Sequence, residues 1–196
     1  MIHFTQDSCD LDVADALALL EFACTDKTTS LGVGICAEGN LCATDGRTLL
    51  VFRLEDAEKA SEAHRNQVWS HAYVKIQVAV AKATKQPVRL MYSAFTGGTF
   101  PPVNQVIPEP GFGVIKAPKT TGKGAKAVPA EPQPKMGPVG FNPAYVGRIE
   151  KVCFALSERK NTGCQLVSMR GELDLLRFEV AANGRSATVV IMPMRI

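Results

Sequence analysis

Seven residues at the end of the sequence, Val190-Ile-Met-Pro-Met-Arg-Ile196, carry the pattern that decides the predicted fold. Pro193 interrupts a β-branched run that would otherwise pair to its end, and such a proline is typical of the edge or terminus of a sheet. Met192 and Met194 place flexible apolar side chains on either side of it, which suits a groove that accepts varied partners. The tail therefore predicts a terminal strand that lines a binding surface.

The unit that leads into this tail begins with a helix. Asn142 and Pro143 form a favoured cap and first turn, and we expect the helix to run to about residue 158. Its predicted buried stripe consists of Tyr145, Ile149, Val152, Cys153 and Leu156. Strands are expected to follow at about 164–169, 173–180 and 187–194.

A similar unit opens the chain. A helix is expected from Asp10 onward, and its early acidic residues suit the positive end of the helix dipole. Its predicted buried stripe consists of Val13, Leu17, Leu20 and Cys24. Strands are expected at 31–36, 41–44 and 48–54, and the Asp45-Gly46 step before the last of them is a good hairpin signal.

The middle of the chain contains a shorter unit. A strand around Val68-Trp69 precedes a helix from about 72 to 84, and Pro87 stops this helix before a strand at 88–93. The predicted buried stripe of the helix consists of Ala72, Ile76, Ala79, Val80 and Ala83. The prolines within 100–108 require an extended chain there.

Residues 109–138 differ in composition from the rest. Gly, Pro, Lys and Ala dominate them, and so little can be buried that a linker or mobile loop is expected. The predicted organisation is a domain of two units at 1–108, the second shortened, then this linker, then a half-domain at 139–196. Three passes of a helix followed by strands predict an internal repeat in an α+β fold, with antiparallel sheets and the helices on one face.

Three separated segments resemble, in the same order, segments of the bacterial sliding clamp, the β subunit of DNA polymerase III. Ala43–Leu49 reads Ala-Thr-Asp-Gly-Arg-Thr-Leu and is similar to an Ala-Thr-Asp-Gly-His-Arg-Leu segment of that family. Gly98–Pro108 is similar to its Gly-Arg-Phe-Pro-Asp-Tyr-Arg-Arg-Val-Leu-Pro segment. Gly140–Val146 and the Val190–Ile196 tail resemble the start and end of its last half-domain. The resemblance implies a DNA-clamp-like fold in a shortened protein of the phage or mobile-element type.

In that family these segments form the pocket that captures partner peptides. Carried over position by position, the implied pocket residues are Thr44, Gly46, Arg47, Leu49, Pro101, Val106, Val190, Ile191, Met192, Pro193, Met194 and Arg195. Leu49, Val106 and Val190 also fit the pattern of ordinary strand core, and this alternative stays open. The sequence has no equivalent of the family's N-terminal domain, so closure of a ring would need a different stoichiometry.

Basic residues on two of the predicted helices are candidates for DNA contact, because clamp helices face the phosphates. These candidates are Lys75, Lys82, Lys85, Arg148, Lys151 and Arg159. A solvated basic face explains them equally well. The first helix argues against DNA, because its region contains Asp10, Asp12, Asp15 and Glu21.

Composition limits the remaining functions. With 196 residues, 46% of them hydrophobic, and a net charge of +3, the chain has no strong overall attraction to nucleic acid. No targeting segment or membrane-spanning stretch is visible, so we expect a cytoplasmic protein without membrane contact. The six cysteines include no C-x-x-C pair, and the sequence contains no nucleophile–base pair, metal cluster or phosphate loop. We therefore expect neither a cofactor nor catalysis.

Two non-enzymatic functions remain. The first is a sliding-clamp-like DNA replication processivity or recruitment factor. Its expected partners are DNA polymerases or other proteins with a clamp-binding motif, double-stranded DNA bound without sequence preference, and further copies of the chain in a homo-oligomer. The second is a clamp-like adaptor or decoy that binds polymerase-type peptides without encircling DNA. The acidic first helix and the small net charge favour the second function without settling the choice.

Overall fold

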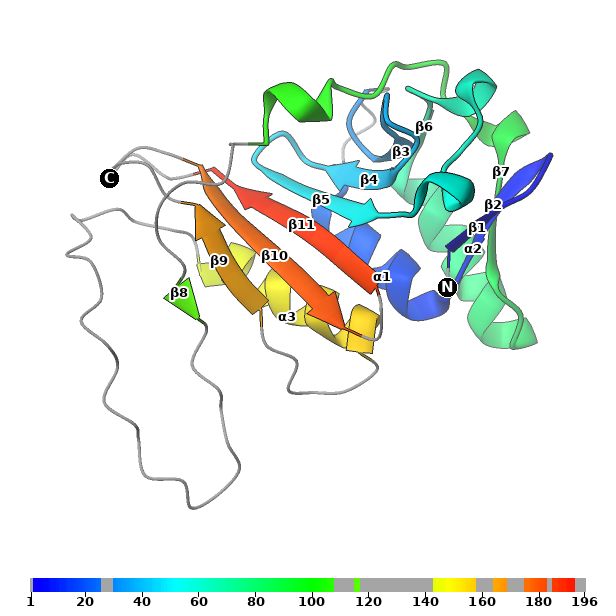
Figure 1. Cartoon of the computed structure of the whole chain (residues 1–196). Helices are drawn as coiled ribbons and strands as arrows, with labels where there is room; N and C mark the ends of the chain where they lie inside the picture. Colours follow the sequence, from blue (N-terminus) through cyan, green and yellow to red (C-terminus); the bar gives the residue numbers. More distant parts are fainter. Residues whose placement is uncertain are drawn as a thin grey trace.

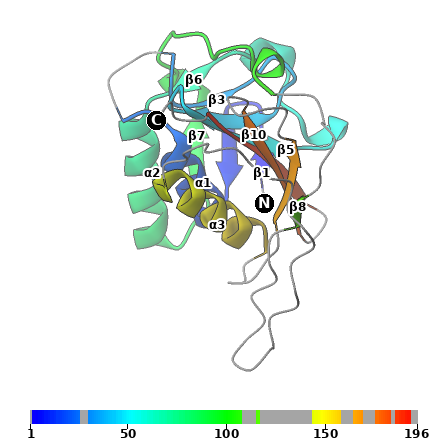
Figure 2. The same cartoon turned by 90° about the vertical axis from the view of Figure 1, so that its left-hand side faces the viewer.

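The structure is a computed structural model, and it describes residues 2–25, 30–107, 115–116, 143–157, 164–168, 175–182 and 185–192. Within these residues, antiparallel strands form two sheets, and three α-helices lie side by side against them (Figure 1; Figure 2). The fold is therefore α+β, as the sequence predicts. No helix in the described ranges has both the length and the apolar character needed to span a membrane.

The larger sheet has eight strands in the order β6-β3-β4-β5-β11-β10-β9-β8. These strands are β3 (Val33–Ile35), β4 (Leu41–Thr44), β5 (Thr48–Arg53), β6 (Val68–Trp69), β8 (Ile115–Lys116), β9 (Cys164–Ser168), β10 (Leu176–Ala182) and β11 (Arg185–Ile191). At its centre β5 pairs with β11 through six residue pairs, from Thr48 with Ile191 to Arg53 with Ser186. One sheet thus joins strands from the first and last parts of the chain.

The same arrangement repeats on either side of the β5–β11 pair. Moving outward, β4 and β3 follow on one side, and β10 and β9 follow on the other (Figure 1). A helix precedes each set of three strands: α1 (Val13–Phe22) precedes β3 to β5, and α3 (Pro143–Ser157) precedes β9 to β11. The two helices pack against each other and against the strands of this sheet. The order of elements is the helix followed by three strands that the sequence predicts for these two regions.

The smaller sheet contains the first two strands of the chain and has the order β1-β2-β7. Its strands are β1 (Ile2–Phe4), β2 (Ser8–Leu11) and β7 (Val88–Met91), and α2 (His71–Thr84) packs against β7 and α1. Two side chains bond to the backbone of β7: the Trp69 indole N–H donates to the Met91 carbonyl (2.7 Å), and the Met91 N–H donates to the Tyr73 hydroxyl (3.0 Å). These bonds fix α2 and its preceding strand to the small sheet.

Short 3₁₀ turns complete the described chain. They are η1 (Asp56–Glu58), η2 (Glu62–His64), η3 (Tyr92–Ala94) and η4 (Val103–Gln105).

The strand β5 is buried on both faces, and its alternate residues belong to two different apolar clusters. Leu50 and Phe52 join the helix-side cluster, which includes Leu19 and Phe22 of α1. Leu49 and Val51 point the other way. They join the outer-face cluster, which we define as Cys36, Cys42, Leu49, Val51, Val68, Phe100, Val103 and Val190, with Val106, Ile107 and Leu175 partly buried against it. Helices thus cover one face of the large sheet, and the 100–107 segment covers part of the other face.

Most of the predicted helices and strands are present. The extended chain predicted at 100–108 is wrong where η4 (Val103–Gln105) forms a 3₁₀ turn, because Pro101 and Pro102 restrict only themselves and the residues before them.

The buried stripe predicted for α2 is wrong, and that predicted for α1 is only partly confirmed. In α1 the fully buried residues are Asp15, Ala16, Ala18, Leu19 and Phe22. Of the predicted stripe, Val13 and Leu20 are partly buried against the helix-side cluster, whereas Leu17 is 39% exposed. In α2 the helix packs through Val74, Val78 and Ala81, and the predicted stripe faces outward. Both helices are apolar around most of their circumference, so periodicity alone does not determine which face the neighbouring elements cover.

The stripe of α3 is confirmed where its side chains are described. Tyr145, Ile149, Val152 and Leu156 are all buried in the helix-side cluster. The side chain of Cys153 lies outside the described residues.

Replacing Leu50 with Ala should lower the free energy of unfolding by about 2–5 kcal/mol, because it leaves a cavity beneath the helices where β5 pairs with Val189 of β11. Replacing the exposed Leu17 with Ala is the matched control and should change it by less than about 1 kcal/mol. Urea unfolding measures both. An equal loss in the two variants would mean that the described burial is wrong.

Candidate partner-peptide site

Sequence segments that are far apart along the chain meet on the outer face of the large sheet. Leu49 of β5 lies opposite Val190 of β11, and both belong to the outer-face cluster. Val106 packs against this cluster from the segment that follows η4. Phe100 and Val103 of the same segment are buried within it. The structure thus brings together one or more members of each of the three segments that resemble the clamp pocket.

Four further candidates of the pocket lie beside members of this cluster along the chain. The Met192 N–H donates to the Arg47 carbonyl (2.9 Å), which ties the start of the tail to the β4–β5 turn. Met192 is 39% exposed, and Gly46 and Arg47 are also exposed. Pro101 is half-buried at the start of the covering segment. These residues form a rim of mixed character beside a buried apolar floor.

Two of the candidates have roles other than lining a pocket. Ile191 is fully buried in the helix-side cluster, because it alternates with Val190 and points to the opposite face of the sheet. The Thr44 hydroxyl donates to the Thr48 carbonyl (2.8 Å) and accepts a bond from the Gly46 N–H (3.1 Å), so it stabilises the turn. Pro193, Met194 and Arg195 lie outside the described residues.

The turn between β4 and β5 is organised by the Asp45 carboxylate. Asp45 Oδ1 accepts bonds from the Arg47 N–H (2.9 Å), the Thr48 N–H (2.7 Å) and the Thr48 hydroxyl (3.0 Å). Gly46 has a φ of 82°, a left-handed conformation that glycine adopts without strain. The Asp-Gly pair therefore provides both the acceptor and the backbone freedom that this turn requires.

An arginine of α3 completes this turn. The Arg148 guanidinium donates to Asp45 Oδ2 and to the Thr48 hydroxyl, both at 2.7 Å, and it lies 4.9 Å from the centre of the Tyr145 ring. Burial acts to raise the pKa of Asp45, but the bonds from Arg148, Arg47 and Thr48 outweigh it and hold the pKa below its usual value. The exposed side chain of Arg47 is hydrogen-bonded to Tyr145 of α3, which raises the pKa of Arg47. The first half of the sheet is thereby attached to the second helix of the repeat.

A second ion pair makes the reciprocal connection. Arg185, at the start of β11, donates to Oδ2 of the buried Asp15 in α1 (2.7 Å) and to the Ala155 carbonyl of α3 (3.3 Å). The helix α1 of the first half therefore bonds to the start of β11 in the second half. The helix α3 of the second half bonds to the turn before β5 in the first half. Sequence patterns did not reveal either pair, because each joins residues more than a hundred positions apart.

The basic candidates for DNA contact differ in whether they are paired with carboxylates or exposed. Arg148 is held by Asp45, and Lys151 pairs with Glu21 of α1 at 2.5 Å. Lys75, Lys82 and Lys85 are exposed on or directly after α2. Arg159 lies outside the described residues.

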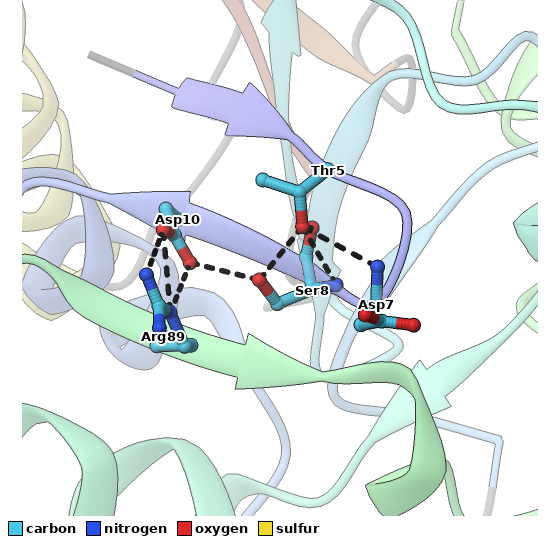
Figure 3. Close-up of polar contacts among 5 residues, drawn as sticks. All are labelled: Thr5, Asp7, Ser8, Asp10 and Arg89. Atoms are coloured by element: carbon cyan, nitrogen blue, oxygen red, sulfur yellow. Dashed lines mark hydrogen bonds and ion pairs between the residues drawn. The ribbon is translucent and has the colours of Figure 1, made fainter.

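The acidic residues that argue against DNA are largely neutralised. Asp15 pairs with Arg185 and Glu21 pairs with Lys151. Asp10 lies in β2 rather than in a helix, and its carboxylate accepts bonds from Arg89 (2.8 and 3.0 Å) and from the Ser8 hydroxyl (3.0 Å) (Figure 3). The bonds from Arg89 are the main cause of its lowered pKa. The repulsion expected from these carboxylates is correspondingly weak.

Two cysteines of the outer-face cluster are the candidates for reactive thiols. Cys36, directly after β3, and Cys42 of β4 are both buried, and the neighbouring Cys42 thiol lowers the pKa of Cys36 against the effect of burial. Burial raises the pKa of Cys42. Within the described ranges, no group of three or more His, Cys, Asp or Glu side chains is placed to hold a metal ion.

No protein-family model matches the chain, and no curated protein matches it significantly.

Replacing Asp45 with Asn should lower the free energy of unfolding at neutral pH by about 1.5–3 kcal/mol, because the charge-assisted bonds to Arg148 and Thr48 are weakened. Because its pKa is lowered in the folded state, Asp45 contributes this stability above the ordinary carboxyl pKa and loses it as the pH falls through the lowered value. The difference between variant and native chain should therefore shrink in acid. Urea unfolding from neutral to acidic pH measures it.

The matched control is Asp56→Asn. Asp56 is exposed and also bonds to a basic side chain, that of Lys59 (2.7 Å), yet its replacement should leave stability unchanged. Equal losses in the two variants, or an Asp45 effect that grows in acid, would contradict this role of the turn.

Proposed function

We propose that this chain is a sliding-clamp-like recruitment factor of DNA replication, which binds short peptide motifs of DNA polymerases or similar partners on the outer face of its large sheet. The observation that carries the proposal is the convergence of Leu49, Val106 and Val190 in one apolar cluster. These residues come from three separated segments that resemble the clamp pocket, and chance resemblance does not require that they meet.

The chemistry of this surface suits a peptide with apolar anchors. Leu49 and Val190 form a floor, Val106 is partly buried beside them, and Met192 is exposed at the edge. A leucine or aromatic side chain of a partner can pack against the half-buried Val106 and the exposed Met192 above this floor, and the adaptable Met192 can adjust to its shape.

The architecture supports a clamp-like fold. The two halves of the large sheet carry the same order of elements around the β5–β11 pair, and α1 and α3 pack side by side on one face. Such a repeat fits a domain built from two clamp-like halves. In this proposal the helices lie on the side away from the peptide surface.

A second function is favoured by one observation. Arg148 and Lys151, two of the basic residues expected to face DNA, are held in ion pairs with Asp45 and Glu21. Because these positive charges are paired within the chain, they are less available to DNA phosphates. This fits an adaptor or decoy that binds the peptide motifs of partners without encircling DNA. Both functions use the same peptide surface, and they differ only in whether duplex DNA is bound.

We expect the chain to bind a fluorescent clamp-binding peptide of the glutamine-x-x-leucine-phenylalanine type with a micromolar Kd, about −8 kcal/mol. Met192→Ala should weaken binding about tenfold, because it removes an exposed apolar contact at the edge of the surface. Met91→Ala is the matched control, since Met91 is 36% exposed on β7 of the other sheet. Fluorescence anisotropy measures all three Kd values.

Absence of binding by the folded native chain, or equal weakening by both methionine variants, would remove the peptide surface from the account. Adding a labelled DNA duplex to the same assay separates the two functions. Salt-dependent DNA binding favours the processivity factor, whereas peptide binding without DNA binding favours the adaptor.

A further inference from the structure

The helix α2 has two apolar faces, and the smaller one is buried. It packs through Val74, Val78 and Ala81. On the opposite side, the apolar residues recur at the spacing of one helical face over three turns. This outward stripe consists of Ala72, Ile76, Ala79, Val80 and Ala83.

The outward stripe is open to solvent. Ile76 is 60% exposed and Val80 is 49% exposed, the two highest values among the exposed large hydrophobic side chains in the described part of the chain. The helix α1 packs beside α2 (Figure 2), and its Leu17 is also exposed, at 39%. Val80 also forms part of the wall of an open cleft of about 290 Å³ between α2 and β7. Scattered single hydrophobic residues on a surface are ordinary, but a stripe with helical periodicity indicates an interaction face.

The charge around the outward stripe has one sign. Lys75 and Lys82 lie along one side of it, Lys85 follows its end, and α2 contains no acidic residue. After burial, the positive charge of Lys75 is the main factor that lowers the pKa of His71 at the start of the helix. Two carboxylates on elements of the same part of the fold are already paired: Glu21 of α1, which also acts on His71, with Lys151, and Asp10 of β2 with Arg89. The face is thus apolar along its centre and positive at its side.

We propose that the outward stripe of α2 binds an acidic amphipathic helix of a partner protein. Such a helix would place apolar residues at i, i+4 and i+7 against Ile76, Ala79 and Val80, and its carboxylates beside Lys75 and Lys82. Duplex DNA fits this face less well, because phosphates would have to lie against an apolar stripe that offers them no hydrogen-bond donor. The surface is separate from the outer-face cluster and does not rest on the peptide function proposed for it.

The test uses the full chain and two designed four-turn helical peptides with the same leucine stripe, one flanked by glutamates and the other by lysines. The native chain should bind the acidic peptide at least about tenfold more tightly than the basic one, and added salt should weaken this binding. The double variant Ile76→Ser and Val80→Ser should reduce the affinity about tenfold. The double variant Lys75→Glu and Lys82→Glu should reverse the preference between the two peptides.

Met91→Ser is the matched control, because it removes an exposed apolar side chain from β7 and should leave the affinity unchanged. Circular dichroism checks that every variant folds. Three outcomes would overturn the proposal. The first is an acidic-peptide affinity that the Ile76 and Val80 variant does not change. The second is duplex DNA binding that displaces the peptide and is lost only when the lysines are reversed. The third is a native homodimer that dissociates in the Ile76 and Val80 variant, since the occupant would then be a second copy.

Discussion

The antiparallel pairing of β5 with β11 is the constraint on which the rest of the structure depends. It places Leu49 opposite Val190 and Leu50 opposite Val189, so one pair of strands contributes to both apolar clusters. Arg53 reinforces the pairing by donating to the Thr188 hydroxyl at 2.9 Å. The ion pairs of Arg148 with Asp45 and of Asp15 with Arg185 then hold each helix to the other half. Because these contacts join the first and last parts of the chain, the outer-face cluster forms only when the whole sheet is assembled.

Local chemistry explains what could be predicted from the sequence. The Asp45-Gly46 step predicted a hairpin, and β4 and the start of β5 lie where it requires. The start of α3 follows from Pro143, which suits the first turn of a helix. The burial of Ile76 and Val80 was predicted wrongly, because α2 is apolar on two sides and only its neighbours decide which side is covered. From the sequence alone, the charge of Asp15 argues against DNA binding, but Asp15 is buried and paired with Arg185, which lies in a distant strand.

What could be predicted of the two proposed binding surfaces from the sequence is limited in the same way. The apolar character of Leu49, Val106 and Val190 is visible in the sequence, whereas their meeting on one face of the sheet depends on strand pairing. The basic residues of the helices have different roles in the structure: Arg148 and Lys151 stabilise contacts between elements, and Lys75 and Lys82 border an exposed stripe. Two separate surfaces on opposite layers suit a protein that recruits partners. In this account the outer face of the sheet takes an extended peptide and α2 takes a helix.

Hydrogen–deuterium exchange of the full chain, with and without a saturating clamp-binding peptide, tests the central claim most directly. The account predicts slower exchange in three separate regions, at 44–49, 103–107 and 190–192, because these segments lie together around the outer-face cluster. Exchange in α2 should not change, since that helix lies away from the peptide surface. Protection of only one of the three regions, or of α2 in their place, would contradict the claim that the three segments form one binding surface.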